Sequence, residues 1–385
     1  MEKMIYLDYA ATTPMSEGAL QAYRKVAKRY YGNPSSIHDP GSTAARVVEK
    51  AREALAGMLG VPDRARGVFF TGSGSEANEL ALRSLLKGTP DRRHVVASPI
   101  EHSCVRNTLR LLEEEGCAVD YLPVDRRGYV DPEDLRGMLQ PETGLVTVHH
   151  AHPELGVVQP LEELGEAARE AGVPLHSDAV QSFGKIPVEA ARMGLSAVSV
   201  SAHKLYGPKG LGAVWMDPSV NWKGVMPGAT QQNGFRQGTL DAPAVAAFLA
   251  ALREAEEERD ERDRRLRALH ERMLKGLRAL PFEVSLEGEP EEGLPGLVGL
   301  RVPGMEGQYL MLECNRKGVA ISTGSACTVG TGKPPHTMTR LGYEAQEARE
   351  FIRLSFGKET GEGQLDRALE VLAGVVRAHY EMTGA

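Results

Sequence analysis

Short apolar and β-branched runs alternate with helical patterns between about Val47 and Met216 of this chain. Such alternation is typical of a parallel β-sheet covered by helices, because each crossover between parallel strands needs a long connection. Apolar residues at helical spacing predict helices at 76–86 and 161–171. The expected strands are 68–70, 95–98, 145–149, 174–177, 197–201 and 212–216. In such sheets, ligands bind at the carboxyl ends of the strands.

The rest of the chain predicts a second, smaller unit. A chain of 385 residues exceeds the size at which one hydrophobic core keeps growing. The charged stretch 244–280 has helical spacing and mixed signs, which is typical of a solvated helix face. Strand-like runs follow at 298–302 and 352–356.

The composition narrows the classes of partner. A hydrophobic content of 42% and a net charge of −7 are typical of a globular protein that binds small molecules or proteins rather than nucleic acid. No apolar run reaches the roughly 18 residues of a membrane span, and none resembles a signal segment. Four cysteines without a C-x-x-C pair predict free thiols in a reducing cytoplasm.

A glycine-rich turn, residues 71–76, follows the first expected strand and opens a helix. Its free N–H groups and the positive end of the helix dipole suit a phosphate. A simple helix cap would account for this turn equally well.

Asp178 and Lys204 end two neighbouring strands, so a carboxylate and an amine are expected to meet at one edge of the sheet. Pyridoxal phosphate (PLP) needs a lysine to bind its aldehyde carbon and an acid beside its pyridine nitrogen. Either residue alone is more often part of a surface ion pair. Together, after a phosphate-type turn, they predict a PLP site.

Two further residues are candidates for chemistry. His102 ends another strand, where an imidazole could stack on a planar ring or move a proton, although a lone histidine is more often structural. Cys327 lies in a polar, glycine-rich loop at 324–332 that suits a reactive thiolate. We expect Cys104, Cys117 and Cys314 to be inert.

Together these residues resemble the cysteine desulfurases, a branch of the fold-type-I PLP enzymes in the class-V aminotransferase family, over nearly the whole chain. The similar motifs are 6–14, 32–36 and the Ser-x-His-Lys-x-Tyr-Gly-Pro-Lys-Gly run at 201–210. The resemblance implies an α/β fold with a large PLP-binding domain, 13–250, built on a mainly parallel seven-stranded sheet flanked by helices. It also implies a small α+β domain, 251–385, and a joining segment, 1–12.

The resemblance implies roles for residues that hold the cofactor. His102 would stack on the ring and help to move protons, Asp178 would bind the pyridine nitrogen, and Gln181 would reach the phenolic oxygen. Lys204 would carry the cofactor and act as a base. The cofactor phosphate would be held by Gly74, Ser75, Ser201 and His203.

Further matches concern the substrate and the partner subunit. Arg353 would clamp the substrate carboxylate, for which a guanidinium fork has the right geometry, and Asn33 is a second candidate for substrate binding. Thr239 matches the residue through which one subunit completes the phosphate site of the other, which implies a homodimer.

The resemblance also implies a reaction. PLP would convert L-cysteine to L-alanine while the Cys327 thiolate takes the sulfur as a persulfide. That sulfur would pass to an acceptor protein, either a scaffold for iron–sulfur clusters or a thiolation protein.

The chain departs from the family pattern at one point of the predicted site. The family carries Asn-Asn-Glu where this chain has His152, Pro153 and Glu154. Proline offers neither a side-chain amide nor a backbone N–H, so a cofactor contact is expected to be lost unless His152 replaces it. His149, His150 and His152 have strand spacing without a carboxylate in register, and we expect no metal site.

Two alternatives remain open on the sequence. One is a PLP enzyme with another substrate, such as a selenocysteine lyase, a cysteine sulfinate lyase or an aminotransferase. The other is a non-catalytic relative that binds PLP or partners only.

Overall fold

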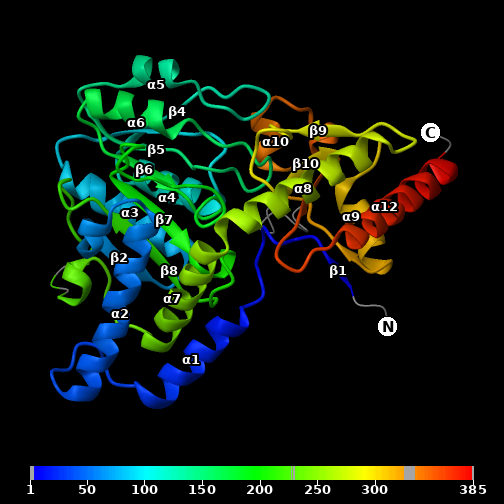
Figure 1. Ribbon diagram of the computed structural model, residues 1–385. Helices are drawn as coiled ribbons and strands as arrows, with labels where there is room; N and C mark the ends of the chain where they lie inside the picture. Colours follow the sequence, from blue (N-terminus) through cyan, green and yellow to red (C-terminus); the bar gives the residue numbers. More distant parts are fainter. Residues whose placement is uncertain (1–3, 227, 229, 325–333, 384–385) are drawn as a thin grey trace.

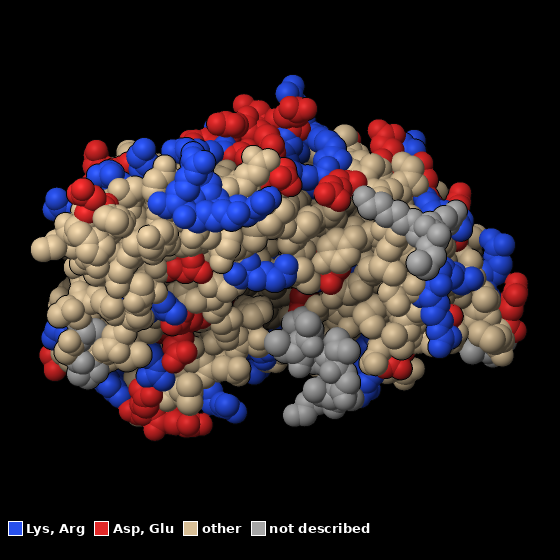
Figure 2. All heavy atoms as spheres, turned by 90° about the horizontal axis from the view of Figure 1, so that it is seen from below, with Lys and Arg blue, Asp and Glu red and all other residues tan. Residues whose placement is uncertain are grey.

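The computed structural model describes residues 4–226, 228, 230–324 and 334–383. Figure 1 shows a large unit built on a seven-stranded sheet and a smaller unit that holds β9, β10, α9 and α12. Both termini lie at the smaller unit. No helix among the described residues is long and apolar enough to cross a membrane. On the face in Figure 2, acidic and basic side chains lie interspersed.

The seven-stranded sheet confirms the expected α/β architecture. Its strand order is β2-β8-β7-β6-β5-β3-β4, and all pairs are parallel except those of β8, which is antiparallel to β7 and β2. Six of these strands lie where the sequence predicts them, within two residues at each end. The strands are β2 (Val68–Thr71), β3 (His94–Ala97), β4 (Ala118–Tyr121), β5 (Thr143–Thr147), β6 (Leu175–Asp178), β7 (Ala197–Ser201) and β8 (Gly212–Met216).

Alternating residues of the strands supply two apolar layers, one on each face of this sheet. In β2, Phe69 packs with the apolar side chains of α3 (Gly74–Gly88) and α4 (Ser103–Glu114). Phe70 points to the other face, where it joins residues of α2 (Asp39–Met58), α6 (Leu161–Glu170) and α7 (Ala242–Glu257). The sheet is therefore covered on both faces, and ligands can reach it only at its edges and strand ends. Other helices of this unit are α1 (Glu17–Arg29) and α5 (Pro132–Met138).

The smaller unit packs helices against a three-stranded antiparallel sheet with the order β12-β10-β9. Its own apolar cluster combines strand residues such as Val298 and Ile352 with Met273 of α8 and Val375 of α12. Leu7 belongs to this cluster too, and β1 pairs with β11, so the N-terminal segment is part of the smaller unit. The elements are β1 (Ile5–Tyr6), α8 (Arg259–Arg278), β9 (Ser285–Glu287), β10 (Leu297–Arg301), α9 (Gly307–Arg316), β11 (Val319–Ala320), α10 (His336–Arg340), α11 (Ala345–Arg349), β12 (Phe351–Ser355) and α12 (Glu362–Thr383).

The expected helical stretch 244–280 is two helices rather than one. α7 ends at Glu257 and α8 begins at Arg259. Ala255 of α7 still packs in the core of the large unit, whereas Leu269 of α8 packs in the core of the smaller one. The chain therefore changes unit between these residues, close to the predicted boundary at 250, and the division into domains stays a prediction.

A buried ion-pair cluster joins β10 to neighbouring elements. Arg301 Nε lies 2.6 Å from Glu287 Oε1, and its Nη1 lies 3.1 Å from Glu350 Oε2. Side-chain exposure is only 12% for Arg301, 4% for Glu287 and 10% for Glu350. These two nearly buried carboxylates thus share one guanidinium as their counter-charge.

Arg301→Leu is expected to lower the free energy of unfolding by about 3–5 kcal/mol, because both carboxylates would remain buried without a counter-charge. Urea denaturation of the cofactor-free protein measures the change. The matched control is Arg367→Leu, which breaks the exposed pair with Glu370 and should cost less than about 1 kcal/mol. Equal effects of the two substitutions would contradict this account of the cluster.

Candidate active site

A cavity of about 290 Å³ opens at the carboxyl ends of the parallel strands. Segments that follow β2, β3, β5, β6 and β7 all contribute to its wall, as expected for a sheet of this type. Residues of β12 and of the N-terminal segment close it from the smaller unit. The cavity brings together most of the predicted site residues, namely Gly74, Ser75, His102, Asp178, Gln181, Ser201, His203, Lys204 and Arg353.

One side of the cavity is built to hold an anion. Ser73 caps α3, its Oγ accepting a hydrogen bond from Glu76 N, so the first turn of the helix faces the cavity with free N–H groups. Ser201 Oγ is buried and has no hydrogen-bond partner among the described residues. A Cβ atom at Gly74 would lie 3.0 Å from side-chain atoms of Ser201 and Val180, so glycine keeps this space open. A phosphate group fits these donors and this space.

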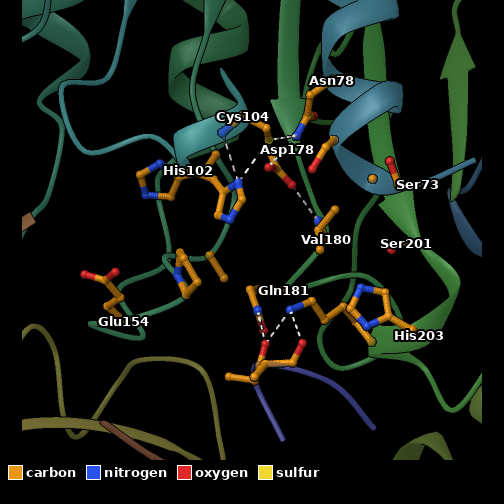
Figure 3. A pocket seen from close by; sticks show the side chains of 18 of the residues that line it. Ser73, Asn78, His102, Cys104, Glu154, Asp178, Val180, Gln181, Ser201 and His203 are labelled. Atoms are coloured by element: carbon orange, nitrogen blue, oxygen red, sulfur yellow. Dashed lines mark hydrogen bonds between the residues drawn. The ribbon is translucent and has the colours of Figure 1, made fainter. Parts of the chain in front are cut away.

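Asp178 is held in place by two donors, as Figure 3 shows. Asn78 Nδ2 donates to its Oδ2 at 2.7 Å, and Val180 N donates to its Oδ1 at 2.9 Å. Asn78 is 1% exposed and was missed by the sequence analysis. It lies one helical turn after Gly74 on α3, and this spacing is the signal that places both on the same face.

Lys204 lies where the large unit meets the N-terminal segment. Its Nζ donates to Ala10 O at 2.5 Å and to Ala11 O at 2.8 Å. Burial, followed by the nearby Arg353, lowers the pKa of Lys204 from 10.5 to about 8. A much larger fraction of this amine is therefore neutral near neutral pH than for a free lysine, which suits a nucleophile or base.

His102 caps α4 and lines the cavity beside Cys104. Its Nδ1 accepts from Cys104 N at 3.3 Å and lies 3.0 Å from Cys104 Sγ. Burial is the largest cause that lowers the pKa of His102, which keeps the imidazole neutral. Burial also raises the pKa of Cys104 to about 12, in accord with an inert thiol, although its place in the cavity wall was not expected.

Arg353 is 3% exposed and points into the cavity from β12. Its Nη2 lies 2.6 Å from Asp8 Oδ1, and its Nη1 donates to Pro153 O at 2.9 Å. Nε is buried and has no partner among the described residues. The Arg353 guanidinium is thus held in place while some of its N–H donors remain unused, as binding of a carboxylate requires.

His152 does not replace the amide that Pro153 lacks. Its Nδ1 accepts from the backbone N–H groups of Glu154 and Leu155, and its Nε2 lies 3.0 Å from Ile100 O. The side chain is 1% exposed and is not among the residues that line the cavity. His149 is likewise engaged, since its Nδ1 lies 3.0 Å from Glu101 Oε1. His149 lines the cavity, whereas His152 only holds the backbone of the neighbouring segment in place.

Two predicted residues, Asn33 and Thr239, are not among those that line this cavity. Asn33 and Thr239 are exposed in loops of the same chain, and Asn33 Oδ1 accepts from Ser35 N. Cys327 lies outside the described residues. Ser322 and Gly324, which precede Cys327 in the sequence, do line the cavity. The roles of Asn33, Thr239 and Cys327 stay predictions.

Asn78→Ala is expected to weaken the affinity of the cofactor-free protein for PLP about tenfold, because the Asp178 carboxylate would lose its side-chain donor. Fluorescence titration with PLP measures the change. Asn221→Ala, which removes an amide bonded to Gly88 O away from the cavity, is the matched control. Unchanged PLP affinity in Asn78→Ala would show that Asp178 needs no such support.

Comparisons with known proteins agree with this geometry. Residues 5–368 match the family Aminotransferase class-V. An IscS-like cysteine desulfurase of Mycobacterium tuberculosis is 38% identical over 97% of this chain and 96% of its own. The structure of a NIFS-like protein superposes with a TM-score of 0.89 and 30% identity, covering 97% of this chain and 99% of that one. The structure of SspA in complex with cysteine does so with a TM-score of 0.78 and 30% identity, covering 91% and 98%. The chain belongs to the class-V aminotransferases and, within them, to the cysteine desulfurases.

Proposed function

We propose that this protein converts L-cysteine to L-alanine with PLP and transfers the sulfur to Cys327 as a persulfide. The observation that carries the proposal is one cavity in which Lys204, Asp178, His102 and Arg353 converge beside a site for an anion. The cavity thus contains an amine, an acid and a carboxylate clamp, which are the groups that PLP chemistry on an amino acid needs.

Each group of the cavity has a part in holding the cofactor. The turn at Gly74 and Ser75, with Ser201 and His203, would hold the phosphate, Asp178 the pyridine nitrogen and Lys204 the aldehyde carbon. His102 would face the ring. When bound, PLP supplies an electron sink that stabilises negative charge at the α-carbon of the substrate.

Arg353 and Lys204 act on the substrate. Arg353 binds the α-carboxylate of cysteine with the donors that Asp8 and Pro153 leave free. Lys204, once released, removes the α-proton, a role that its pKa of about 8 favours. His102, held neutral by burial, can take up or release a proton beside the reacting atoms.

Cys327 completes the transfer. Its thiolate attacks the substrate sulfur, so that an S–S bond forms as the C–S bond breaks, and the electron pair of the broken bond stays on the substrate carbon. That carbon is protonated to give the methyl group of alanine. The products are alanine and the persulfide of Cys327, and no external oxidant or reductant is consumed.

We also propose a cytoplasmic homodimer that passes its sulfur to an acceptor protein for iron–sulfur clusters or thiolation. Tyr31 and Ile37, on either side of Asn33, are 76% and 100% exposed, which supports a protein contact at this segment. Asn33 and Thr239 would then contribute to the cavity of the partner subunit.

Absorbance spectroscopy of the purified protein tests the proposal. The visible band of lysine-bound PLP is expected to change when L-cysteine is added, with alanine and sulfide formed under a thiol reductant. L-Serine, which lacks the sulfur, is the matched control. A band that ignores cysteine would mean another substrate, and no band would mean a relative that does not use PLP.

A further inference from the structure

Gln181 is one of two residues with a side-chain amide among the described residues that line the cavity. Among the residues that line the cavity, the other amide belongs to Asn78, whose nitrogen is used to hold Asp178. Pro153 contributes no amide. Gln181 can therefore offer a ligand either its N–H donor or its carbonyl oxygen, depending on the orientation of its amide.

Two neighbours fix that direction. Gln181 Nε2 donates to Ala10 O at 2.8 Å, and Lys185 Nζ donates to Gln181 Oε1 at 3.0 Å. The carbonyl of Ala10 can only accept and protonated Lys185 can only donate, so a flipped amide would face each of them with the wrong group. Gln181 Nε2 donates one of its two hydrogens to Ala10 O, so the other remains available.

We propose that Lys185 is a positioning residue for the cofactor: it orients the Gln181 amide so that a donor N–H, rather than the carbonyl oxygen, is presented to the anionic phenolic oxygen of PLP. This inference rests on the proposed use of PLP. Lys185 is not among the residues that line the main cavity. It lines a small neighbouring cavity, which Lys204 lines too.

An ordinary structural role does not account for Lys185. Within the described part of the chain, Lys185 forms no ion pair with a carboxylate, and the charged groups that shift its pKa are the cations Lys204, Arg262 and Arg353. Burial, followed by these cations, lowers the pKa of Lys185 to about 7. The Lys185 amine lies in an environment that disfavours its charge, and it donates a hydrogen bond to Gln181, a residue of the cavity. Both observations fit a functional role.

A double-mutant cycle tests the proposal through the affinity of the cofactor-free protein for PLP. Lys185→Met keeps most of the side-chain volume and removes the donor. It is expected to weaken PLP binding about tenfold, as is Gln181→Ala. The double variant Lys185→Met/Gln181→Ala should bind PLP as Gln181→Ala does, because Lys185 acts through Gln181.

Two controls separate positioning from loss of structure. Lys275→Met, on the exposed side of α8, makes the same substitution far from the cavity and should leave PLP affinity unchanged. The thermal unfolding midpoint of cofactor-free Lys185→Met should not fall, since the substitution removes a half-buried charge on which other cations act. The absorbance maximum of bound PLP should shift in Lys185→Met but not in Lys275→Met.

Effects of Lys185→Met and Gln181→Ala that simply add in the double variant would overturn the proposal. So would unchanged PLP affinity in Lys185→Met. All of these measurements are made without cysteine. If the wild type bound PLP but released no alanine from cysteine, the proposed desulfurase activity would be wrong. The double-mutant cycle would still test the role of Lys185, because it measures PLP affinity alone.

Discussion

Lys204→Ala is expected to lower alanine formation from L-cysteine by about 10⁴-fold, because both the attachment point of PLP and the base for the α-proton are lost. The visible band of lysine-bound PLP should disappear at the same time. Lys204 is the one lysine among the described residues that line the cavity, and its pKa is about 8.

Lys209→Ala, which alters an exposed lysine of the same motif, serves as the matched control and should keep the visible band. Absorbance spectra and alanine assays of both variants measure the difference. Lys204→Ala should also bind PLP without a covalent link, which treatment with borohydride would reveal as an absence of reduced, protein-bound cofactor. Alanine formation at a tenth or more of the wild-type rate in Lys204→Ala would exclude Lys204 as the base.

Local patterns were sufficient to predict the frame of the large unit. β7 and β8 begin and end where the sequence predicts them, because both are short runs rich in alanine and valine whose five residues are all buried. β4 was missed because it is a four-residue edge strand with mostly exposed side chains, so it lacks an apolar pattern. The break between α7 and α8 was missed because Glu258 fits a helical pattern as well as its neighbours do.

The site residues at strand ends could be predicted from the sequence, whereas the residues that hold them in place could not. Asp178 and Lys204 were found because parallel strands bring their ends to one edge. Asp8 and Arg353 are 345 residues apart in sequence, and only the folded chain shows that one carboxylate holds the clamp. The same holds for Lys185, since contact with Gln181 is set by the turn after β6.

Cys327→Ser is expected to lower sulfide release and alanine formation from L-cysteine by at least about 10³-fold, because a hydroxyl cannot take up sulfur as a persulfide. PLP binding and the change of the visible band on adding cysteine should remain, since Lys204, Asp178 and Arg353 are untouched. Rapid-mixing absorbance and mass spectrometry of the protein after a single turnover measure both effects.

The other cysteines of the chain provide the control for this prediction. Cys104 lines the same cavity, but burial raises the pKa of its thiol to about 12, so it should carry no sulfur and Cys104→Ala should still form the persulfide. If Cys327→Ser kept its rate of alanine formation, the substrate sulfur would pass directly to another acceptor, such as the added thiol reductant, and Cys327 would not be the sulfur acceptor. Elimination of the sulfur would yield pyruvate rather than alanine. If Cys327→Ser formed alanine but the double variant Cys327→Ser/Cys104→Ala did not, the prediction that Cys104 is inert would be wrong instead.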